Sequence, residues 1–297
     1  MKVLLTGATG FTGGYVLPLL LAEGHSVRCF VRDPARLPES LRGKVEIARG
    51  EFDDSISFRM ACEGCDALVN VASIGFGHGP GIVAAASAAG IRRALFVGTT
   101  AIFTQLNAGS KVRRIEAEAA IMESSLDWTI LRPTMIYGTA RDRNICRLIR
   151  YVARFPVLPV FGSGTYLQQP IHVEDLARGI VTAFRSDRAL RKAYNLSGKE
   201  PLTYNDLVAM VAQLRGQRVF IVHLPYRPVV AVLSLLEKVG MRLPIKGEQI
   251  LRLNENKAFS HEDAARDFGF APRTFAAGIA EQITSMGLIR VPRGQGL

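Results

Sequence analysis

The sequence predicts an α/β fold with a doubly wound parallel sheet and a smaller C-terminal α/β lobe. Short apolar runs alternate with segments of helical periodicity from residue 2 to about residue 132. The runs at residues 67–71 and 94–97 are nearly continuous in apolar character, as expected for strands that helices cover on both faces. The 297 residues exceed the length of one ordinary domain. We therefore expect a first domain over residues 1–165 and a substrate lobe over residues 166–297, with segments that return to the first domain.

The elements are expected in an order that alternates strand and helix. Strands are predicted near residues 2–6, 26–31, 44–48, 66–71, 94–98 and 128–132, and helices near residues 13–23, 54–62, 80–89 and 110–125. The second lobe is predicted to contain helices at 203–214, 228–239, 246–254 and 273–285 and a strand at 218–223. Strands linked by helices form parallel sheets, so the sheet is expected to bind ligands at the carboxyl ends of its strands.

The first predicted strand is followed by the sequence TGATGFTG at residues 6–13. Three glycines at a spacing of three let the backbone approach a pyrophosphate, and the helix that follows presents its N-terminus to the anion. The position of this loop, after a strand and before a helix, predicts a dinucleotide site. The candidate cofactor residues here are Gly7, Thr9, Gly10, Phe11, Thr12 and Gly13.

The second strand leads to Arg32, where a ribose is expected to bind. An arginine can pair with a 2′-phosphate, and Arg36 can supply a second cation, so we expect NADP in preference to NAD. Asp33 weighs against this preference, and a solvated turn is the alternative interpretation. After the third strand, Glu51 and Phe52 are expected near the adenine.

The fourth strand leads to Asn70 and Ala72, and we expect both residues to contact the cofactor. Ser73 and His78 lie in the loop that follows and are candidate substrate contacts. His78 is also a candidate acid or base, and a solvated loop histidine is the alternative.

The composition excludes several classes of protein. The net charge of +11 is concentrated in residues 151–297, which hold 19 basic and 12 acidic side chains and so a net charge of +7. No basic run is interleaved with aromatic residues, so no nucleic-acid partner is expected. No apolar stretch is long enough to span a bilayer, so we expect a cytoplasmic protein without an integral membrane segment.

Residues 229–236 form the longest apolar segment, with basic residues on both sides. This segment leaves peripheral membrane contact open, beside the alternative of a helix packed on the core. Cys62 and Cys65 form a lone C-x-x-C without partners for a zinc site, so no metal is predicted and the four cysteines are expected to be reduced core thiols.

Five segments, at residues 6–13, 50–54, 132–138, 171–177 and 194–198, together resemble the extended or atypical short-chain dehydrogenases/reductases. This group includes the nucleotide-sugar epimerases and dehydratases and the NmrA-like proteins. The resemblance covers residues 1–198 and implies that residues 1–165 form an NAD(P)-binding Rossmann domain. It also implies that the loop containing Pro133 and Met135 meets the nicotinamide carboxamide. Arg143 is expected where relatives hold a sugar nucleotide, with an exposed helix face as the alternative.

The resemblance further implies a Ser or Thr after the fifth strand and a Tyr-x-x-x-Lys motif on the next helix. Thr99 or Thr100 matches the hydroxyl position, and Lys111 matches the lysine. Asn107 stands where the tyrosine is expected, and an amide cannot act as a general acid near neutral pH. Lys111 is therefore predicted either to transfer the proton itself or only to hold the ribose. In the second case another group, such as His78, is the candidate acid or base.

The sequence thus predicts an NADP-preferring oxidoreductase, or an epimerase- or dehydratase-like protein, that acts on a carbonyl or hydroxyl group of a small molecule such as a nucleotide sugar. The alternative from another class is a non-catalytic NADP-binding sensor or assembly factor, because the family tyrosine is absent. Both a monomer and a homodimer are compatible with this sequence.

Overall fold

The computed structural model describes residues 1–106, 109–239, 241 and 247–288, and the chain divides into two compact units. Unit 1 consists of Met1–Thr134, Val173–Ser197 and Phe259–Pro272. Unit 2 consists of Met135–His172, Gly198–Ala258 and the segment that begins at Arg273. The chain therefore passes from one unit to the other several times, and no single cut separates them.

Unit 1 is built on a parallel sheet of seven strands with the order β11-β6-β5-β4-β1-β2-β3. The strands are β1 (Lys2–Thr6), β2 (Ser26–Val31), β3 (Glu46–Arg49), β4 (Ala67–Asn70), β5 (Arg93–Val97), β6 (Asp127–Pro133) and β11 (Lys192–Leu196). The chain first adds strands on one side of β1 and then returns to add strands on the other side. The reversal of strand order between β1 and β4 is the point where such sheets bind ligands.

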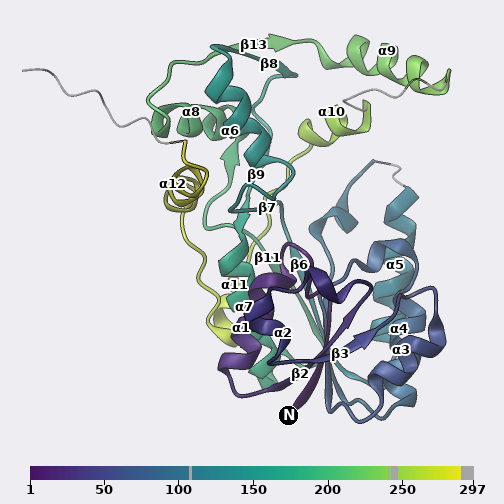
Figure 1. Ribbon diagram of the computed structural model, residues 1–297. Helices are drawn as coiled ribbons and strands as arrows, with labels where there is room; N and C mark the ends of the chain where they lie inside the picture. Colours follow the sequence, from purple (N-terminus) through teal and green to yellow (C-terminus); the bar gives the residue numbers. More distant parts are fainter. Residues whose placement is uncertain (107–108, 240, 242–246, 289–297) are drawn as a thin grey trace, which may run out of the picture. The chain divides into compact units, whose positions relative to one another are not determined.

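Helices cover both faces of this sheet (Figure 1). Helices α3, α4 and α5 lie on one face, and α1 and α7 pack together on the other. The helices of unit 1 are α1 (Gly13–Ala22), α2 (Glu39–Arg42), α3 (Ser55–Cys62), α4 (Gly79–Ala88), α5 (Gly109–Met122), α7 (Val173–Arg185) and α11 (Glu262–Phe268). Short 3-10 helices are η1 (Pro34–Arg36), η2 (Ile74–Phe76), η3 (Thr100–Phe103) and η4 (Asp187–Ala189). The predicted doubly wound fold is confirmed.

The alternation of side chains along the strands explains why two helical layers are needed. Leu4, Leu68, Phe96 and Ile130 belong to the fully buried core shared with α3, α4 and α5. Their strand neighbours point to the opposite face, and these are buried as well. Burying each such side chain contributes about 1.5–3 kcal/mol, so both faces of the sheet stabilise the fold.

Unit 2 holds helices α6 (Ile145–Arg154), α8 (Tyr204–Leu214), α9 (Tyr226–Lys238), α10 (Gly247–Leu253) and α12 (Phe275–Ser285). Its strands form three pairs: β7 (Ile136–Tyr137) with β10 (Ile171–His172), β9 (Leu167–Gln168) with β12 (Leu202–Thr203), and β8 (Val157–Phe161) with β13 (Phe220–Leu224). One apolar cluster, which includes Leu148, Leu207 and Ile279, joins α6, α8 and α12. Unit 2 therefore has its own core.

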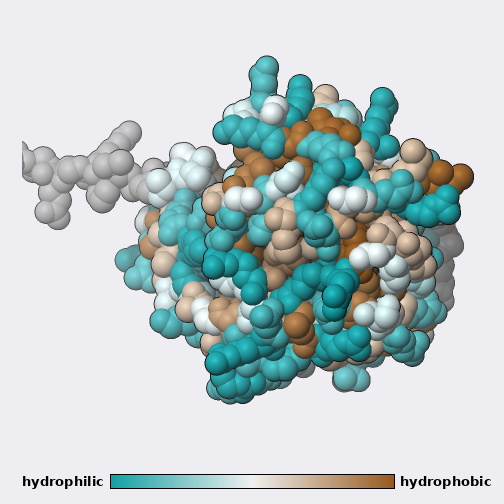
Figure 2. Space-filling view, turned by 90° about the horizontal axis from the view of Figure 1, so that it is seen from below, coloured by the Kyte–Doolittle hydropathy of each residue, from teal (hydrophilic) through white to brown (hydrophobic). Residues whose placement is uncertain are grey.

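The surface agrees with the charged composition. Figure 2 shows one face of the molecule, on which hydrophilic side chains predominate and apolar side chains appear in smaller groups. No helix in the described residues combines the length and the apolar character that crossing a bilayer requires.

Candidate functional site

The glycine loop after β1 is folded so tightly that Gly7 and Gly13 have no room for a side chain. Gly7 has a φ of +73°, and a Cβ on it would lie 2.8 Å from the backbone nitrogen of Ala72. A Cβ on Gly13 would lie 2.1 Å from the carbonyl oxygen of Gly7. The amide of Gly10 donates to that same oxygen at 2.8 Å. Positions 7, 10 and 13 therefore present backbone without a side chain between β1 and the start of α1.

At the start of α1, no side chain of the cap residue or the first turn occupies the backbone N–H groups that would bind an anion. Thr12 is the N-cap residue, its side chain makes no capping hydrogen bond, and the first turn holds no acidic residue. A helix N-terminus carries partial positive charge and favours an anion. The bare loop and this helix end fit the pyrophosphate of a dinucleotide, as predicted for residues 6–13.

A buried hydrogen-bond clamp joins the two strands at the switch point. The hydroxyl of Thr6 donates to Oδ1 of Asn70 at 2.7 Å, and Nδ2 of Asn70 donates to the carbonyl of Ala72 at 2.9 Å. The amide of Ala72 donates back to the Thr6 hydroxyl at 3.3 Å. Asn70 therefore shapes the loop beside Gly7. Thr6 was not predicted as a site residue, although a polar residue at the end of a buried strand is the signal that would have identified it.

The loop after β2 presents two exposed cations. The Asp33 carboxylate accepts the Ala35 amide at 3.0 Å and caps the start of η1. Arg32 and Arg36 are exposed, and in the described part of the chain neither forms an ion pair. The Asp33 carboxylate is thus engaged in the turn, while the guanidinium groups of Arg32 and Arg36 stay exposed.

The loop after β3 gathers aromatic side chains. Phe52 packs against Phe30 and Phe58, and the ring of His78 stacks on Phe52 with the ring centroids 5.5 Å apart. Nδ1 of His78 lies 3.8 Å from a carboxylate oxygen of Asp53. Asp54 caps α3, and Glu51 is exposed. The structure therefore places His78 with the residues predicted near the adenine.

The two threonines after β5 differ in what their hydroxyls do. Thr100 is buried, and its hydroxyl donates to the carbonyl of Pro133 at 3.2 Å. Thr99 is partly exposed, and its hydroxyl accepts the amide of Ala101 at 3.2 Å. The Thr99 hydroxyl keeps its proton available for donation. Of the pair, Thr99 is the better candidate to contact a substrate oxygen.

Lys111, on the first turn of α5, is tied to the segment that follows β5. Its Nζ donates to the carbonyl of Thr104 at 2.6 Å. An ammonium carries three donors, so this bond holds the group in place without using all of them. Asn107, at the position of the family tyrosine, lies outside the described residues.

A buried ion pair fixes α5 against β6. The guanidinium of Arg132 donates to Glu118 through Nε and Nη2, with the shortest N–O distance at 2.5 Å. The Glu118 side chain is 2% exposed. Arg132 also lies over the ring of Phe103 at 5.3 Å, at the end of η3. The pair therefore connects the three elements that carry Thr99, Lys111 and Pro133, and no sequence pattern pointed to it.

Two other predicted site residues belong to unit 2. The carbonyl of Met135 accepts the amide of Ile171 at 2.9 Å, and Arg143 is exposed just before α6. Ser73, in unit 1, caps η2 through its hydroxyl, which accepts the amide of Gly75.

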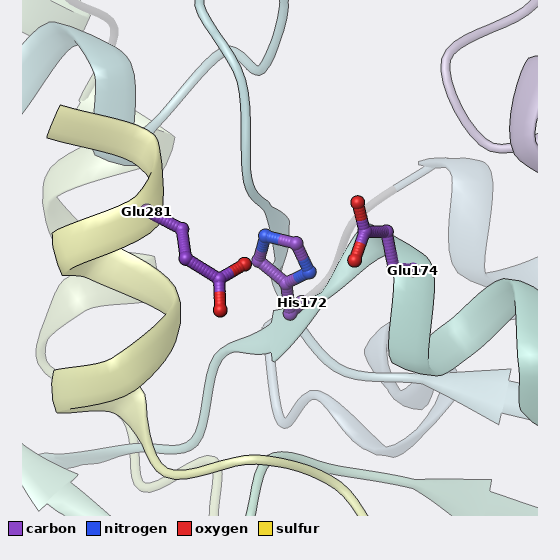
Figure 3. A group of neighbouring side chains, drawn as sticks. All are labelled: His172, Glu174 and Glu281. Atoms are coloured by element: carbon purple, nitrogen blue, oxygen red, sulfur yellow. The ribbon is translucent and has the colours of Figure 1, made fainter. Parts of the chain in front are cut away.

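His172 lies in the core of unit 2. It is 4% exposed, and its ring meets that of Tyr137 edge-on with the centroids 5.3 Å apart. Figure 3 shows the Glu281 side chain, from α12, pointing toward His172, and their ligand-type atoms lie within 4.8 Å. Glu174, also drawn there, lies in the first turn of α7 in unit 1. Tyr137 is 1% exposed, so it remains a core residue.

The cysteines are free and buried, as predicted. Burial raises the pKa of the Cys29 and Cys62 thiols to about 12, and it also raises the pKa of Cys65 and Cys146. Thiolate chemistry is therefore disfavoured at each of these four positions.

A known protein family matches the part of the chain that contains the glycine loop and the strands of unit 1. Residues 7–186, more than half of the chain, match the NAD(P)H-binding family. The chain belongs to the NAD(P)H-binding family. The predicted resemblance to the epimerase- and dehydratase-like short-chain dehydrogenases/reductases is confirmed, and the chain is an NAD(P)-binding protein.

Relatives of this NAD(P)H-binding protein include named reductases. The 2-alkyl-3-oxoalkanoate reductase of Stenotrophomonas maltophilia is 24% identical over 317 residues, which cover 92% of this chain and 95% of the relative. The ceramide reductase of Caulobacter vibrioides is 27% identical over 234 residues, which cover 75% and 73%. The solved structure of MoeE5 in complex with UDP-glucose and NAD superposes with a TM-score of 0.74 at 20% identity, over 97% of this chain and 99% of that chain. The last likeness shows that the fold is shared.

Proposed function

We propose that this protein is an NADPH-dependent reductase that converts a ketone of a small molecule to an alcohol. The observation that carries the proposal is the arrangement at the end of β5. There, the Thr99 hydroxyl has a proton to donate, and the Lys111 ammonium is anchored on the neighbouring helix turn. The names of the two reductases among the relatives favour reduction of a ketone over epimerisation of a sugar.

The cofactor would be held by unit 1. Gly7, Gly10 and Gly13 would admit the pyrophosphate to the backbone, and Arg32 and Arg36 would bind the 2′-phosphate. Phe52 would lie near the adenine. Bound NADPH supplies a hydride to the carbonyl carbon of the substrate.

Residues of this chain would orient and protonate the carbonyl oxygen of the substrate. Thr99 would donate a hydrogen bond to the carbonyl oxygen and so orient it. Lys111 would transfer a proton to that oxygen as its negative charge develops, and would recover a proton from water. This division of roles replaces the phenol of the family motif, because Asn107 cannot donate an acidic proton.

The preference for NADPH is tested first, by calorimetric titration of NADPH and NADH. Arg32→Ala should weaken NADPH binding about tenfold to a hundredfold, since it removes hydrogen bonds to a charged group, and should leave NADH binding unchanged. Arg59→Ala is the matched control, because it removes the same charge from an exposed position of α3. Equal losses for both nucleotides would refute the assignment of Arg32 to the 2′-phosphate.

The role of Lys111 is tested by turnover of 3-oxo esters and UDP-sugars with NADPH. Lys111→Met should lower kcat at least a hundredfold while NADPH affinity changes little, since general acid catalysis contributes about 10²–10⁴-fold. If Lys111 only holds the ribose, the affinity will fall and kcat will persist. Lys44→Met, at an exposed site, serves as the control.

A second candidate is a non-catalytic NADPH sensor, which the asparagine at position 107 favours. Tight NADPH binding without turnover of any ketone or sugar nucleotide would support the sensor. Turnover that Lys111→Met abolishes would exclude it.

A further inference from the structure

The ribbon of β8 and β13 in unit 2 carries apolar side chains on both faces. The strands are parallel, and Phe220, Val222 and Leu224 pair in register with Val157, Pro159 and Phe161. Side chains alternate along a strand, so these six share one face. Of the residues between them, Leu158, Val160 and Ile221 belong to or pack against the core of unit 2, while His223 is exposed and hydrogen-bonded to Asn205.

The face opposite the core is open to solvent. Phe220 is 67% exposed, Val222 and Val157 are each 44% exposed, and Leu224 is 36% exposed. Parallel sheets are usually packed against other elements on both faces. A contiguous exposed apolar patch often marks an interaction site. We call this face the ribbon patch.

Helix α9 follows β13 directly (Figure 1) and also carries exposed apolar side chains. Its exposed residues Val232 and Leu235, with Val239 at its C-cap, are spaced by three and four positions. They therefore lie along one side of the helix. This stripe corresponds to the apolar segment at residues 229–236.

Two arginines stand where the two strands of the ribbon begin. Arg154 and Arg218 line a surface pocket of about 250 Å³, together with Phe155, Gln217 and neighbouring apolar residues. No acidic residue lines this pocket, and neither arginine forms an ion pair within the described residues. Arg147 and Arg150 are also exposed on α6, at four- and seven-residue spacings from Arg154. An anion is therefore favoured beside the ribbon patch.

We propose that unit 2 binds the surface of a bilayer that contains anionic phospholipid. The ribbon patch and the α9 stripe insert among the acyl chains near the headgroups, and Arg154 and Arg218 hold lipid phosphate. A second copy of this chain is a poorer occupant, because each copy would bring the cations Arg154 and Arg218 to the same interface. This inference does not depend on the proposed reductase activity.

The test is flotation of the full-length protein with vesicles of phosphatidylcholine alone and of phosphatidylcholine with phosphatidylglycerol. The protein should bind only the second type, and more weakly as salt is raised. Phe220→Ser/Val222→Ser should reduce binding at least tenfold, and Arg154→Gln/Arg218→Gln should reduce it roughly thirtyfold. NADPH affinity and Tm should stay at the values of the unchanged protein.

Phe76→Ser is the matched control, because Phe76 in unit 1 is 71% exposed and lies outside the ribbon patch. It should bind anionic vesicles normally. Absence of binding to anionic vesicles at low salt, or an equal loss with Phe76→Ser, would overturn the proposal. Sedimentation equilibrium showing a dimer that Phe220→Ser/Val222→Ser dissociates would assign the patch to a second copy instead.

Discussion

At the scale of single residues, neighbouring positions of the same type have different roles. Gly13 and Gly14 are adjacent at the start of α1, yet a Cβ on Gly13 would collide with the Gly7 carbonyl, while one on Gly14 would have its nearest neighbour at 3.9 Å. Thr99 and Thr100 also differ. The Thr100 hydroxyl donates to a buried carbonyl, whereas the Thr99 hydroxyl accepts a backbone amide. The distinctions arise from contacts with residues distant in the sequence.

Gly13→Ala should therefore destabilise the protein by about 1–3 kcal/mol, as overpacking does, and should abolish measurable NADPH binding by displacing the loop. Gly14→Ala should be neutral or should stabilise the helix by up to about 1 kcal/mol. Urea unfolding and calorimetric titration of both variants check this contrast. Equal behaviour of the two would show that the loop tolerates a side chain at position 13.

At the scale of elements, ion pairs fix how helices lie on the sheet of unit 1. The Glu118–Arg132 pair joins α5 to β6, and the carboxylate is almost fully buried. A buried charge that loses its partner is costly, whereas a well-packed apolar pair is often tolerated. The position of Lys111 relative to Thr99 consequently depends on this pair.

Arg132→Met should cost about 3–5 kcal/mol in the free energy of unfolding, because it leaves the Glu118 carboxylate buried without its cation. The double variant Arg132→Met/Glu118→Leu should recover most of that loss. Both values come from urea unfolding. A double variant no more stable than Arg132→Met would show that the pair is not the source of the effect.

Helix α11 is attached to the edge strand β11 through one carboxylate. Asp267 accepts hydrogen bonds from Nζ of Lys192 at 2.9 Å and from the Tyr194 hydroxyl at 2.7 Å. These donors lower the pKa of Asp267 to about 2, from an ordinary value of 3.8, with the Lys192 bond as the largest cause. A lowered pKa in the folded state means that this carboxylate stabilises the fold above about pH 4 and ceases to do so as the pH falls to 2.

Asp267→Asn should therefore lower Tm at pH 7, and the difference from the unchanged protein should shrink between pH 4 and pH 2. Thermal unfolding followed by circular dichroism across this range measures it. A difference that stays constant as the pH falls would mean that the carboxylate charge is not involved.

At the scale of the whole molecule, each unit is assembled from separate stretches of chain. Strand β11 and helices α7 and α11 reach unit 1 only after the chain has passed through unit 2. Helix α7 packs against α1 and covers apolar residues of the sheet. The first part of the chain alone would leave that face exposed.

A fragment of residues 1–165 should consequently fail to unfold cooperatively, since it lacks α7, α11 and β11. Thermal unfolding and limited proteolysis of the fragment, beside the full chain, test this expectation. A sharp transition at the Tm of the full protein would show that the missing segments are dispensable.

The sequence by itself determined the alternation of the main strands and helices from β1 to β6, the parallel sheet and the place of the glycine loop. These features follow from local periodicity and from backbone conformations that only glycine adopts. Short stretches of sequence are therefore enough to predict them. The edge strand β11 escaped notice because Lys192 and Asn195 interrupt its apolar pattern.

Only the tertiary structure decided which polar side chains act together. The clamp of Thr6 with Asn70, the pair of Glu118 with Arg132, and the stacking of His78 on Phe52 each join residues from different elements. The ribbon patch likewise needs two strands more than fifty residues apart, since register determines which side chains share a face. Such contacts depend on long-range pairing, and a hydrogen-bond partner or an uncovered face has no signature in local sequence.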